Sequence, residues 1–470
     1  MNTKTVYSVG QSLLLLLFVA QFATAQNVVI RNATVLSITN GTLENTDVLI
    51  AGGIITEIGT DIRAPRGTQE VDATGKFLMP GIVDAHSHIA LSSINEGSSP
   101  VTAEVSMEDV VNPYHLGIYR ALAGGVTTSH TMHGSANVIG GQNETIKHRW
   151  GVTDPDDLRF DGAPRTIKFA LGENPTRTHG RRASGGTGAI VPSTRMGVEQ
   201  VLRSSFENGK RYMEAWDDYH LKVATDSRAI PPVYNGRLEV MADIIRGNIL
   251  VHCHSYRADE ILMLTRVLAD YGVRNITFQH ANEAFKVAPE LAAFGAHASV
   301  FSDWWSYKFE VYYSTSYNAA ILMRNGIVTS INSDSGELNR HLFHEAGKSQ
   351  RYGGLTDDEA LSMITINPAI QLGIQDRVGS IEIGKDGDVV IFDSHPLSVY
   401  AIPEMTFVEG KKYFDRFEDA DDMRMEVSPT AEIGMYEGQI TGRDRFNHDG
   451  EIINFFELFG QETTLNFEDN

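Results

Sequence analysis

Hydrophobic and polar residues alternate in short runs near both ends of the chain. The runs "NVVIRNATVLS" and "TDVLIAGGIITEIG" lie early in the sequence, and "GSIEIGKDGDVVIFD" lies late. Alternation with a period of two, interrupted by Asn-Gly and Gly-Gly turns, is typical of antiparallel strands with one buried face. We therefore predict a small β-sandwich subdomain built jointly from residues 26–79 and residues 373–417.

Between these ends, over residues 80–372, apolar strand-like runs alternate with amphipathic helical patterns. The clearest unit, "NILVHCHSYRADEILMLTRVLADYGVRNITFQH", predicts a buried strand, a helix capped by Ser255 and ended at Gly272, and a second strand. In a later unit, "NAAILMRNGIVTSINSDSG", a helix leads through a glycine to a strand that ends in Asp334. This alternation predicts an α/β fold, a (β/α)8 TIM-type barrel of parallel strands.

The two extreme segments belong to neither unit. Residues 1–25 combine a lysine, an apolar core and the small residues Ala23 and Ala25, which is the pattern of a secretory signal peptide cleaved before Gln26. The apolar core is shorter than the roughly 20 residues of a membrane-spanning helix. We therefore expect an exported protein, periplasmic or extracellular, with no membrane span, and a polar C-terminal extension of unknown role over residues 418–470.

Composition narrows the choice of partners. The chain has 39 Lys and Arg against 60 Asp and Glu, a formal net charge of -21, which argues against nucleic acid as a partner. A single cysteine, Cys253, excludes an intramolecular disulfide, so stability must come from the core or from bound metal. Strand alternation points Cys253 away from its neighbours His252 and His254, and we interpret it as a packing residue.

Histidines and an aspartate stand at the carboxyl ends of four predicted barrel strands. In "GIVDAHSHIA", His86 and His88 share one face, because side chains at i and i+2 of a strand point the same way. A parallel barrel brings all its strand ends to one rim. Imidazoles together with a carboxylate are the ligands of zinc or a similar divalent cation. The strand-end residues are His86, His88, His252, His254, His280 and Asp334.

At these positions the chain resembles the amidohydrolase superfamily of metal-dependent hydrolases, and the resemblance extends over most of residues 28–415. The motifs that carry it are "FLMPGIVDAHSHIA", "LVHCH", "ITFQH", "TSINSDSG", "TINPAIQLGI" and "VGSIEIGKDGDVVIFD". Through "SANVIGGQ", "IKFALGENPTR" and "STRMG" it looks most similar to the imidazolonepropionase-like and prolidase-like branch.

The resemblance implies roles for the strand-end residues. His86, His88, His252 and His280 would be metal ligands, and Asp334 would both contact the metal and shuttle protons. The implied cofactor is one or two divalent metal ions, with zinc favoured.

Two questions about the ligands stay open. His254 either coordinates the metal directly or faces substrate. Many members of the superfamily hold two metals bridged by a carboxylated lysine or a glutamate, and "TIKFALGENP" offers Lys168 and Glu173 on opposite faces of an ideal strand. We prefer Glu173 as the metal ligand, because it follows Gly172 at the expected end of the strand, whereas Lys168 is expected to lie too deep in it. The alternative for Glu173 is a surface ion pair.

Further polar residues suggest a substrate-binding region. His130 and His133, in "TTSHTMHGSANVIGGQ", should end the second or third strand. Arg177, together with His179, Arg181 and Arg182, should form a basic loop after Glu173. Such a loop could hold a substrate carboxylate through charge-assisted hydrogen bonds, the alternative being a solvated loop. We expect His254, His133 and Arg177 to contact substrate.

Taken together, the sequence predicts an exported hydrolase that cleaves a C–N bond of an amide, cyclic amide or peptide with a metal-activated water. Asp334 would act as general base and then general acid. The alternatives are the same site acting as a deaminase, lactonase or phosphotriesterase, or a non-catalytic metal-binding barrel, because fold and ligands do not fix the substrate. The expected partner is a small molecule or short peptide, and a homo-oligomer is compatible with the sequence.

Overall fold

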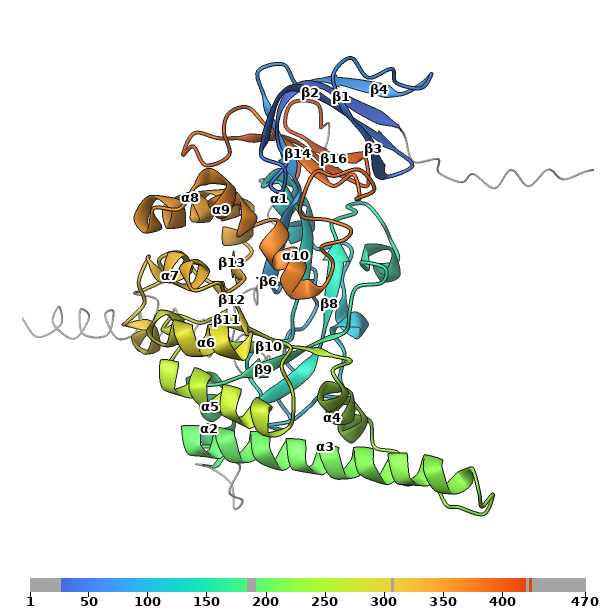
Figure 1. Cartoon of the computed structure of the whole chain (residues 1–470), viewed down its shortest axis with the longest axis vertical. Helices are drawn as coiled ribbons and strands as arrows, with labels where there is room; N and C mark the ends of the chain where they lie inside the picture. Colours follow the sequence, from blue (N-terminus) through green and yellow to red (C-terminus); the bar gives the residue numbers. More distant parts are fainter. Residues whose placement is uncertain (1–26, 184–191, 306–307, 420–421, 425–470) are drawn as a thin grey trace, which may run out of the picture.

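The computed structural model describes residues 27–183, 192–305, 308–419 and 422–424. The predicted signal peptide and nearly all of the predicted C-terminal extension lie outside these ranges. The described chain forms two eight-stranded sheets, one above the other, with the helices gathered around the lower sheet (Figure 1).

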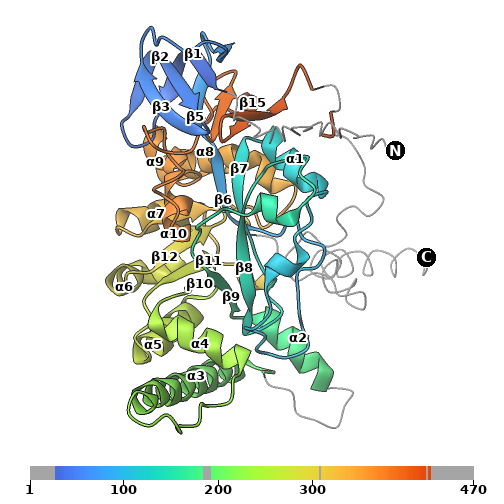
Figure 2. The same ribbon diagram turned by 90° about the vertical axis from the view of Figure 1, so that its right-hand side faces the viewer.

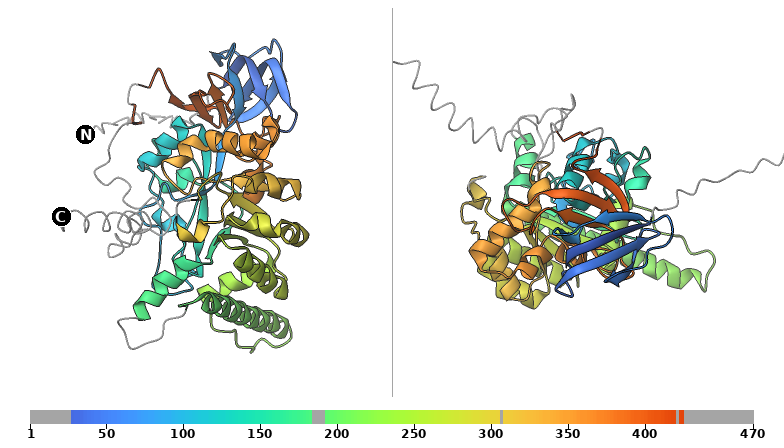
Figure 3. Two further views of the ribbon diagram at one scale, coloured as in Figure 1. Left: turned by 90° about the vertical axis from the view of Figure 1, so that its left-hand side faces the viewer. Right: turned by 90° about the horizontal axis from the view of Figure 1, so that it is seen from above.

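The upper sheet combines strands from both ends of the chain. Its order is β16-β15-β14-β5-β1-β2-β3, and β4 pairs with β1. The two ends meet where β5 and β14 pair antiparallel, with Phe77 opposite Phe392, so the blue and orange-red strands lie side by side in Figure 3. The predicted joint subdomain is confirmed as this sheet. Its strands are β1 (Val28–Leu36), β2 (Thr42–Ala51), β3 (Ile54–Gly59), β4 (Gln69–Asp72), β5 (Phe77–Pro80), β14 (Val389–Phe392), β15 (Pro403–Val408) and β16 (Lys411–Asp415).

The lower sheet curves into a nearly closed barrel, and its strands follow one another in chain order from β6 to β13. Buried apolar side chains of these strands and of the surrounding helices form the largest core of the molecule. The predicted barrel is thereby confirmed. Its strands are β6 (Ile82–Ser87), β7 (Val126–Thr131), β8 (Ile139–Lys147), β9 (Thr166–Ala170), β10 (Leu250–Ser255), β11 (Ile276–His280), β12 (His297–Val300) and β13 (Thr329–Ile331).

One strand departs from the expected parallel pattern. β8 runs antiparallel to both β7 and β9, whereas the other neighbouring barrel strands pair in parallel. Residues 132–138 join β7 to β8 directly, and a parallel crossover needs about a dozen or more residues. The carboxyl end of β8, at Lys147, therefore lies opposite the start of β7, at the far rim from the other strand ends.

Helices cover the outside of the barrel, and α5 to α9 follow one another along one side of it (Figure 2). Within the described chain, none of the helices is both long and apolar enough to cross a lipid bilayer. The α-helices are α1 (Leu116–Ala123), α2 (Glu173–Ala183), α3 (Arg195–Val223), α4 (Gly236–Arg246), α5 (Ala258–Asp270), α6 (Ala288–Phe294), α7 (Asn318–Arg324), α8 (Leu342–Gly353), α9 (Asp357–Ser362) and α10 (Ile366–Leu372).

The unit β10–α5–β11 matches the pattern expected from the sequence except at the helix cap. Ser255 is the last residue of β10, and its Oγ donates to the Gln279 carbonyl at 3.3 Å, so it does not cap α5. The N-cap residue of α5 is Arg257, whose side chain makes no capping hydrogen bond. Gly272 follows the end of α5 with a φ of 74°, a left-handed conformation that glycine adopts without strain.

Hydrogen bonds between the two edge strands complete the barrel. After β13 ends at Ile331, the Asp334 N–H donates to the His86 carbonyl at 3.0 Å, and the Ser333 N–H donates to Asp84 Oδ1 at 3.1 Å. The Ser333 hydroxyl also donates to Asp84. These bonds bring the chain after β13 against the carboxyl end of β6.

Candidate metal centre

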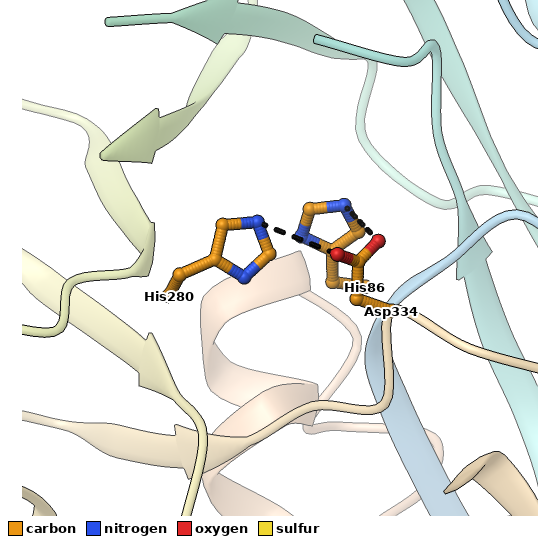
Figure 4. A group of neighbouring side chains, drawn as sticks. All are labelled: His86, His280 and Asp334. Carbon is orange, nitrogen blue, oxygen red and sulfur yellow. Dashed lines mark ion pairs between the residues drawn. The ribbon is translucent and has the colours of Figure 1, made fainter. Parts of the chain in front are cut away.

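Three candidate ligands meet at the carboxyl ends of the barrel strands. One ligand atom each of His86, His280 and Asp334 lies within 4.8 Å of the others, and all three side chains are buried (Figure 4). His86 Nε2 is 3.5 Å from Asp334 Oδ1, and His280 Nε2 is 3.9 Å from Asp334 Oδ2. Strands β6 and β11 and the segment after β13 thus bring together residues that are far apart in the sequence.

His88 joins this group, as the spacing of the two histidines predicts. Its Nε2 lies 3.2 Å from Asp334 Oδ1, so the two imidazoles of the His-x-His motif contact the same carboxylate. Its Nδ1 lies 2.8 Å from the Met132 carbonyl, which can only accept a hydrogen bond. The Nδ1 atom must therefore carry the proton, which leaves a lone pair on the Nε2 atom that faces Asp334.

The two histidines of β10 lie beside this cluster. His252 Nε2 is buried and has no hydrogen-bond partner among the described residues, which is rare for a buried polar atom. Burial lowers the pKa of His252 well below its usual value, so the ring is neutral. The His254 ring centroid lies 4.9 Å from that of His280. Metal coordination and substrate contact by His254 both stay predictions.

The backbone at two of the candidate ligands is strained. His280 has a φ of 64° and Asp334 a φ of 48°, in the left-handed region that residues other than glycine rarely adopt. Such conformations cost on the order of 1–3 kcal/mol and concentrate at functional sites. At His280 the left-handed turn interrupts the alternation of β11, so that Gln279 and His280 both reach the barrel interior.

A buried carboxyl, Asp84, holds the segment that carries Asp334. Asp84 lies two residues before His86 on the same face of β6 and accepts the bonds from Ser333 that hold the chain before Asp334. Burial raises the pKa of Asp84 to about 7, although hydrogen bonds from Ser333 and from the His86 N–H oppose the shift. Asp84 was not predicted as a residue of the site, although the same i, i+2 spacing that pairs His86 with His88 places it on their face of the strand.

The expectation that Lys168 lies too deep in its strand is wrong. Lys168 is fully buried in β9, and its Nζ lies 3.0 Å from His86 Nε2. Glu173 instead begins α2, and its carboxylate lies 3.5 Å from both Lys308 Nζ and Arg177 Nη1. β9 ends at Ala170, before Glu173, so strand alternation does not direct the glutamate inward. Between the two candidates, the structure places Lys168 against a candidate ligand and Glu173 in an ion-pair group.

His133 and Arg177, expected to contact substrate, make contacts within the protein, and substrate contact stays a prediction for both. The Gly134 carbonyl lies 2.8 Å from His133 Nδ1, and the Glu96 N–H donates to His133 Nε2 at 2.9 Å, so both ring nitrogens are used by the backbone. His130 likewise contacts the Ala85 carbonyl and the Thr166 hydroxyl. Residues 173–183, expected as a basic loop, form α2, where Arg177 pairs with Glu173 one helical turn away.

The donor set suits a divalent cation. Neutral imidazole nitrogens and a carboxylate oxygen are the atoms that bind zinc and similar ions. His86, His88, His280 and Asp334 converge, and the buried His252 Nε2 has no hydrogen-bond partner among the described residues. These residues fit a bound metal ion better than a purely hydrogen-bonded core.

Comparison with known proteins identifies the class to which this fold and site belong. The model of the amidohydrolase family matches residues 77–415, and the chain belongs to that family. The predicted family membership is confirmed, and the homologous proteins are hydrolytic enzymes.

Particular relatives agree with this assignment. The amidohydrolase tasK of Hapsidospora irregularis is 31% identical over 407 residues, which cover 78% of this chain and 40% of that protein, so the chain spans less than half of this relative. The imidazolonepropionase of Thermoplasma volcanium is 24% identical over 361 residues, covering 75% of this chain and 84% of that protein. The crystal structure of an amidohydrolase from Thermotoga maritima is 34% identical, with a TM-score of 0.74, over 83% of this chain and 100% of that chain.

Proposed function

We propose that this protein hydrolyses a C–N bond of an amide, cyclic amide or short peptide, with zinc as its metal. The observation that carries the proposal is the convergence of His86, His280 and Asp334 within 4.8 Å at the carboxyl ends of the barrel strands, where catalytic residues of such barrels lie. An imidazole-rich shell favours zinc among the common divalent ions. The imidazolonepropionase among the relatives, by its name an enzyme of a small cyclic substrate, supports this substrate class.

The side chains of the centre divide the work of hydrolysis. His86, His88, His280 and Asp334 would hold a divalent cation, which would supply a Lewis acid for polarising the scissile carbonyl and activating water. Asp334, whose carboxylate contacts His86 and His88, takes a proton from the attacking water and returns it to the leaving nitrogen. The hydrogen bond from the Asp334 N–H to the His86 carbonyl and the bonds from Ser333 to Asp84 hold this carboxylate in place. Fixed geometry of this kind lowers the entropic cost of reaching the transition state.

The test is a substrate screen of the zinc-loaded protein against dipeptides, cyclic imides, lactones, amino-purines and phosphotriesters. We expect turnover of a member of the first two classes, and its loss when the metal is removed with a chelator. The zinc-loaded Asp334→Asn variant is the matched control, because it should bind the same substrates without turning them over. Turnover confined to lactones, amino-purines or phosphotriesters would overturn the proposed bond class, and absence of turnover with every class would favour a non-catalytic metal-binding barrel.

We also propose that the protein is exported after cleavage of residues 1–25. The proposal rests on the apolar core and on the small residues Ala23 and Ala25 before Gln26. The intact mass of the protein recovered from its native host measures this directly. A mature protein that begins at Gln26 is expected, and a mass that retains the first 25 residues would overturn the proposal.

A further inference from the structure

Gln279 connects two candidate ligands of the metal centre. Its side chain is fully buried. Its Oε1 lies 3.2 Å from His86 Nδ1, and its Nε2 lies 3.0 Å from His252 Nδ1. A single amide group therefore contacts the same type of ring nitrogen in both imidazoles.

The two ends of an amide place opposite demands on these nitrogens. The amide oxygen only accepts and the NH2 group only donates, while a neutral imidazole carries one proton. His86 Nδ1 must therefore hold the proton that it donates to Oε1, which leaves a lone pair on Nε2. His252 Nδ1 must be bare to accept from the NH2 group, which puts the proton of His252 on Nε2.

A second contact supports this assignment for His86. Its Nε2 lies 3.0 Å from Lys168 Nζ. A lysine ammonium group only donates, so this contact also requires a lone pair on His86 Nε2. Turning the amide by 180° would instead bring its NH2 group to His86 Nδ1, and would move the proton to the Nε2 atom that faces the ammonium group. In either orientation, Gln279 allows only one of the two neutral rings to offer an Nε2 lone pair.

We infer that Gln279 is a positioning residue that makes the two histidines unequal: His86 offers Nε2 to a metal ion, and His252 Nε2 carries a proton that hinders it from binding a second ion. The inference rests on the proposed metal centre and addresses the choice between one and two ions, which the sequence left open. The protein should therefore bind one divalent ion tightly and a second one weakly. Partners that orient ligand histidines typically change metal affinity by roughly 10- to 100-fold, which sets the expected size of the effect.

The first test observes the protons directly in the metal-free protein. Long-range 1H–15N spectra of protein labelled at histidine distinguish a proton on Nδ1 from one on Nε2, and single His86 and His252 variants assign the two signals. We expect the Nδ1–H form for His86 and the Nε2–H form for His252. The same form in both rings would overturn the inference, whether or not the protein is catalytic.

The second test replaces the amide of residue 279, which donates to one imidazole and accepts from the other, by a group that only accepts. Gln279→Glu is nearly the same size, but its carboxylate accepts from both Nδ1 atoms, so both rings can offer Nε2. Titration of the metal-free proteins with zinc should show that the second ion binds roughly 10- to 100-fold more tightly to this variant than to the wild type. The matched control is Gln142→Glu, which adds the same charge beside Arg165 outside the centre and should leave both affinities unchanged.

Different outcomes separate this inference from the proposed function. Two ions bound with similar affinity by the wild type, or an unchanged second affinity in a folded Gln279→Glu variant, would overturn the role of Gln279 and leave the hydrolase proposal intact. If the metal affinities are as expected but no substrate is turned over, the hydrolase proposal is overturned and the role of Gln279 stands. Gln279→Leu removes both hydrogen bonds, so it no longer orients His86. Binding of the first ion should therefore weaken by roughly 10- to 100-fold.

Discussion

Two lysines of the barrel, Lys147 in β8 and Lys168 in β9, are both fully buried, yet their surroundings differ. Lys147 Nζ lies 2.5 Å from Asp386, 3.2 Å from Asp388 and 3.2 Å from Glu409. Lys168 Nζ lies instead 3.0 Å from the imidazole of His86. Because β8 is antiparallel, the two lysines lie in different parts of the barrel. Lys147 joins the barrel to the second sheet, and Lys168 faces the metal centre.

The carboxylates around Lys147 show what a structural buried charge requires. Burial alone would raise the pKa of Glu409, but the hydrogen bond from Arg149 and the charge of Lys147 lower it to about 2. Asp386 is paired from its outer side by Arg377 at 2.7 Å. Opposite charges thus compensate one another within the protein. Burial of a lysine therefore does not by itself mark a functional site, because Lys147 and Lys168 are both buried and differ only in the groups that they contact.

The largest expected effect is the loss of stability on replacing Lys147, the lysine paired with carboxylates. Lys147→Met leaves the buried Asp386 and Asp388 without their shared cation, and removal of one partner from a buried ion pair costs about 3–5 kcal/mol. Urea unfolding should show a loss of that size in the free energy of unfolding. The control Arg377→Met removes a partly exposed partner of the same Asp386 and should cost about 1 kcal/mol or less. Equal losses in the two variants would refute the special role of Lys147.

The next effect falls on turnover and leaves stability largely unchanged. Asp334→Asn keeps the size of the side chain and one acceptor oxygen, but it cannot accept a proton at neutral pH. Loss of a general acid–base group should lower kcat by roughly 100-fold or more, while the histidines retain most of the metal. Steady-state kinetics on the substrate found in the screen and metal analysis of the same sample measure both quantities. Near-normal turnover would contradict the assigned proton transfer.

Lys168→Met sharpens the contrast between the two lysines. We expect metal affinity to fall by roughly tenfold or more, because Lys168 lies beside His86 and, in carboxylated form, is the bridging ligand that the resemblance to the family offers. The loss of stability should be smaller than in Lys147→Met. Glu173→Gln is the matched comparison, since its ion pairs with Arg177 and Lys308 lie on α2, and metal affinity should not change. Metal titration of both variants decides. Weaker metal binding only in Glu173→Gln would restore the preference that the sequence suggested.

The smallest effect is the response of a buried histidine at the base of the barrel to pH. Burial lowers the pKa of His148 to about 4, although a hydrogen bond to the Val126 carbonyl opposes the shift, and the unfolded value is about 6.5. The unfolded chain therefore binds this proton first, so stability is full above pH 6.5 and falls as the pH drops toward 4. By pH 5.5 the loss should be about 1 kcal/mol. Urea unfolding from pH 7 to 4.5 measures this effect. The free energy of unfolding should fall less steeply with decreasing pH in His148→Gln than in the wild type.

Much of the fold could be predicted from local patterns. Alternation marks the strands at both ends, and the same pattern at both ends predicts one joint sheet, in which Phe77 lies opposite Phe392. The unit from β10 to β11 has its helix and strands where the apolar periodicity puts them. The direction of β8 was not predicted, because it depends on how residues 132–138 connect two strands in space and not on the pattern within either strand.

For the metal centre, the sequence by itself determined which residues reach the carboxyl ends of the barrel strands. Side chains two apart on a strand point the same way, and parallel strands end at one rim, so His86, His88 and His280 had to come near one another. Only the tertiary structure showed that Lys168 lies beside His86 while Glu173 lies in an ion-pair group, because these positions depend on β9 ending at Ala170 and on α2 beginning at Glu173.

The contacts of Gln279 and His133 were also decided only by the tertiary structure. Alternation places Gln279 and His280 on opposite faces of β11, but the left-handed φ of 64° at His280 interrupts the alternation and lets both side chains reach the barrel interior. His133 looks like a rim ligand in the sequence, yet backbone groups of Glu96 and Gly134 occupy both of its nitrogens. A strand pattern fixes the face of a side chain, whereas its hydrogen-bond partners come from segments that only folding brings near.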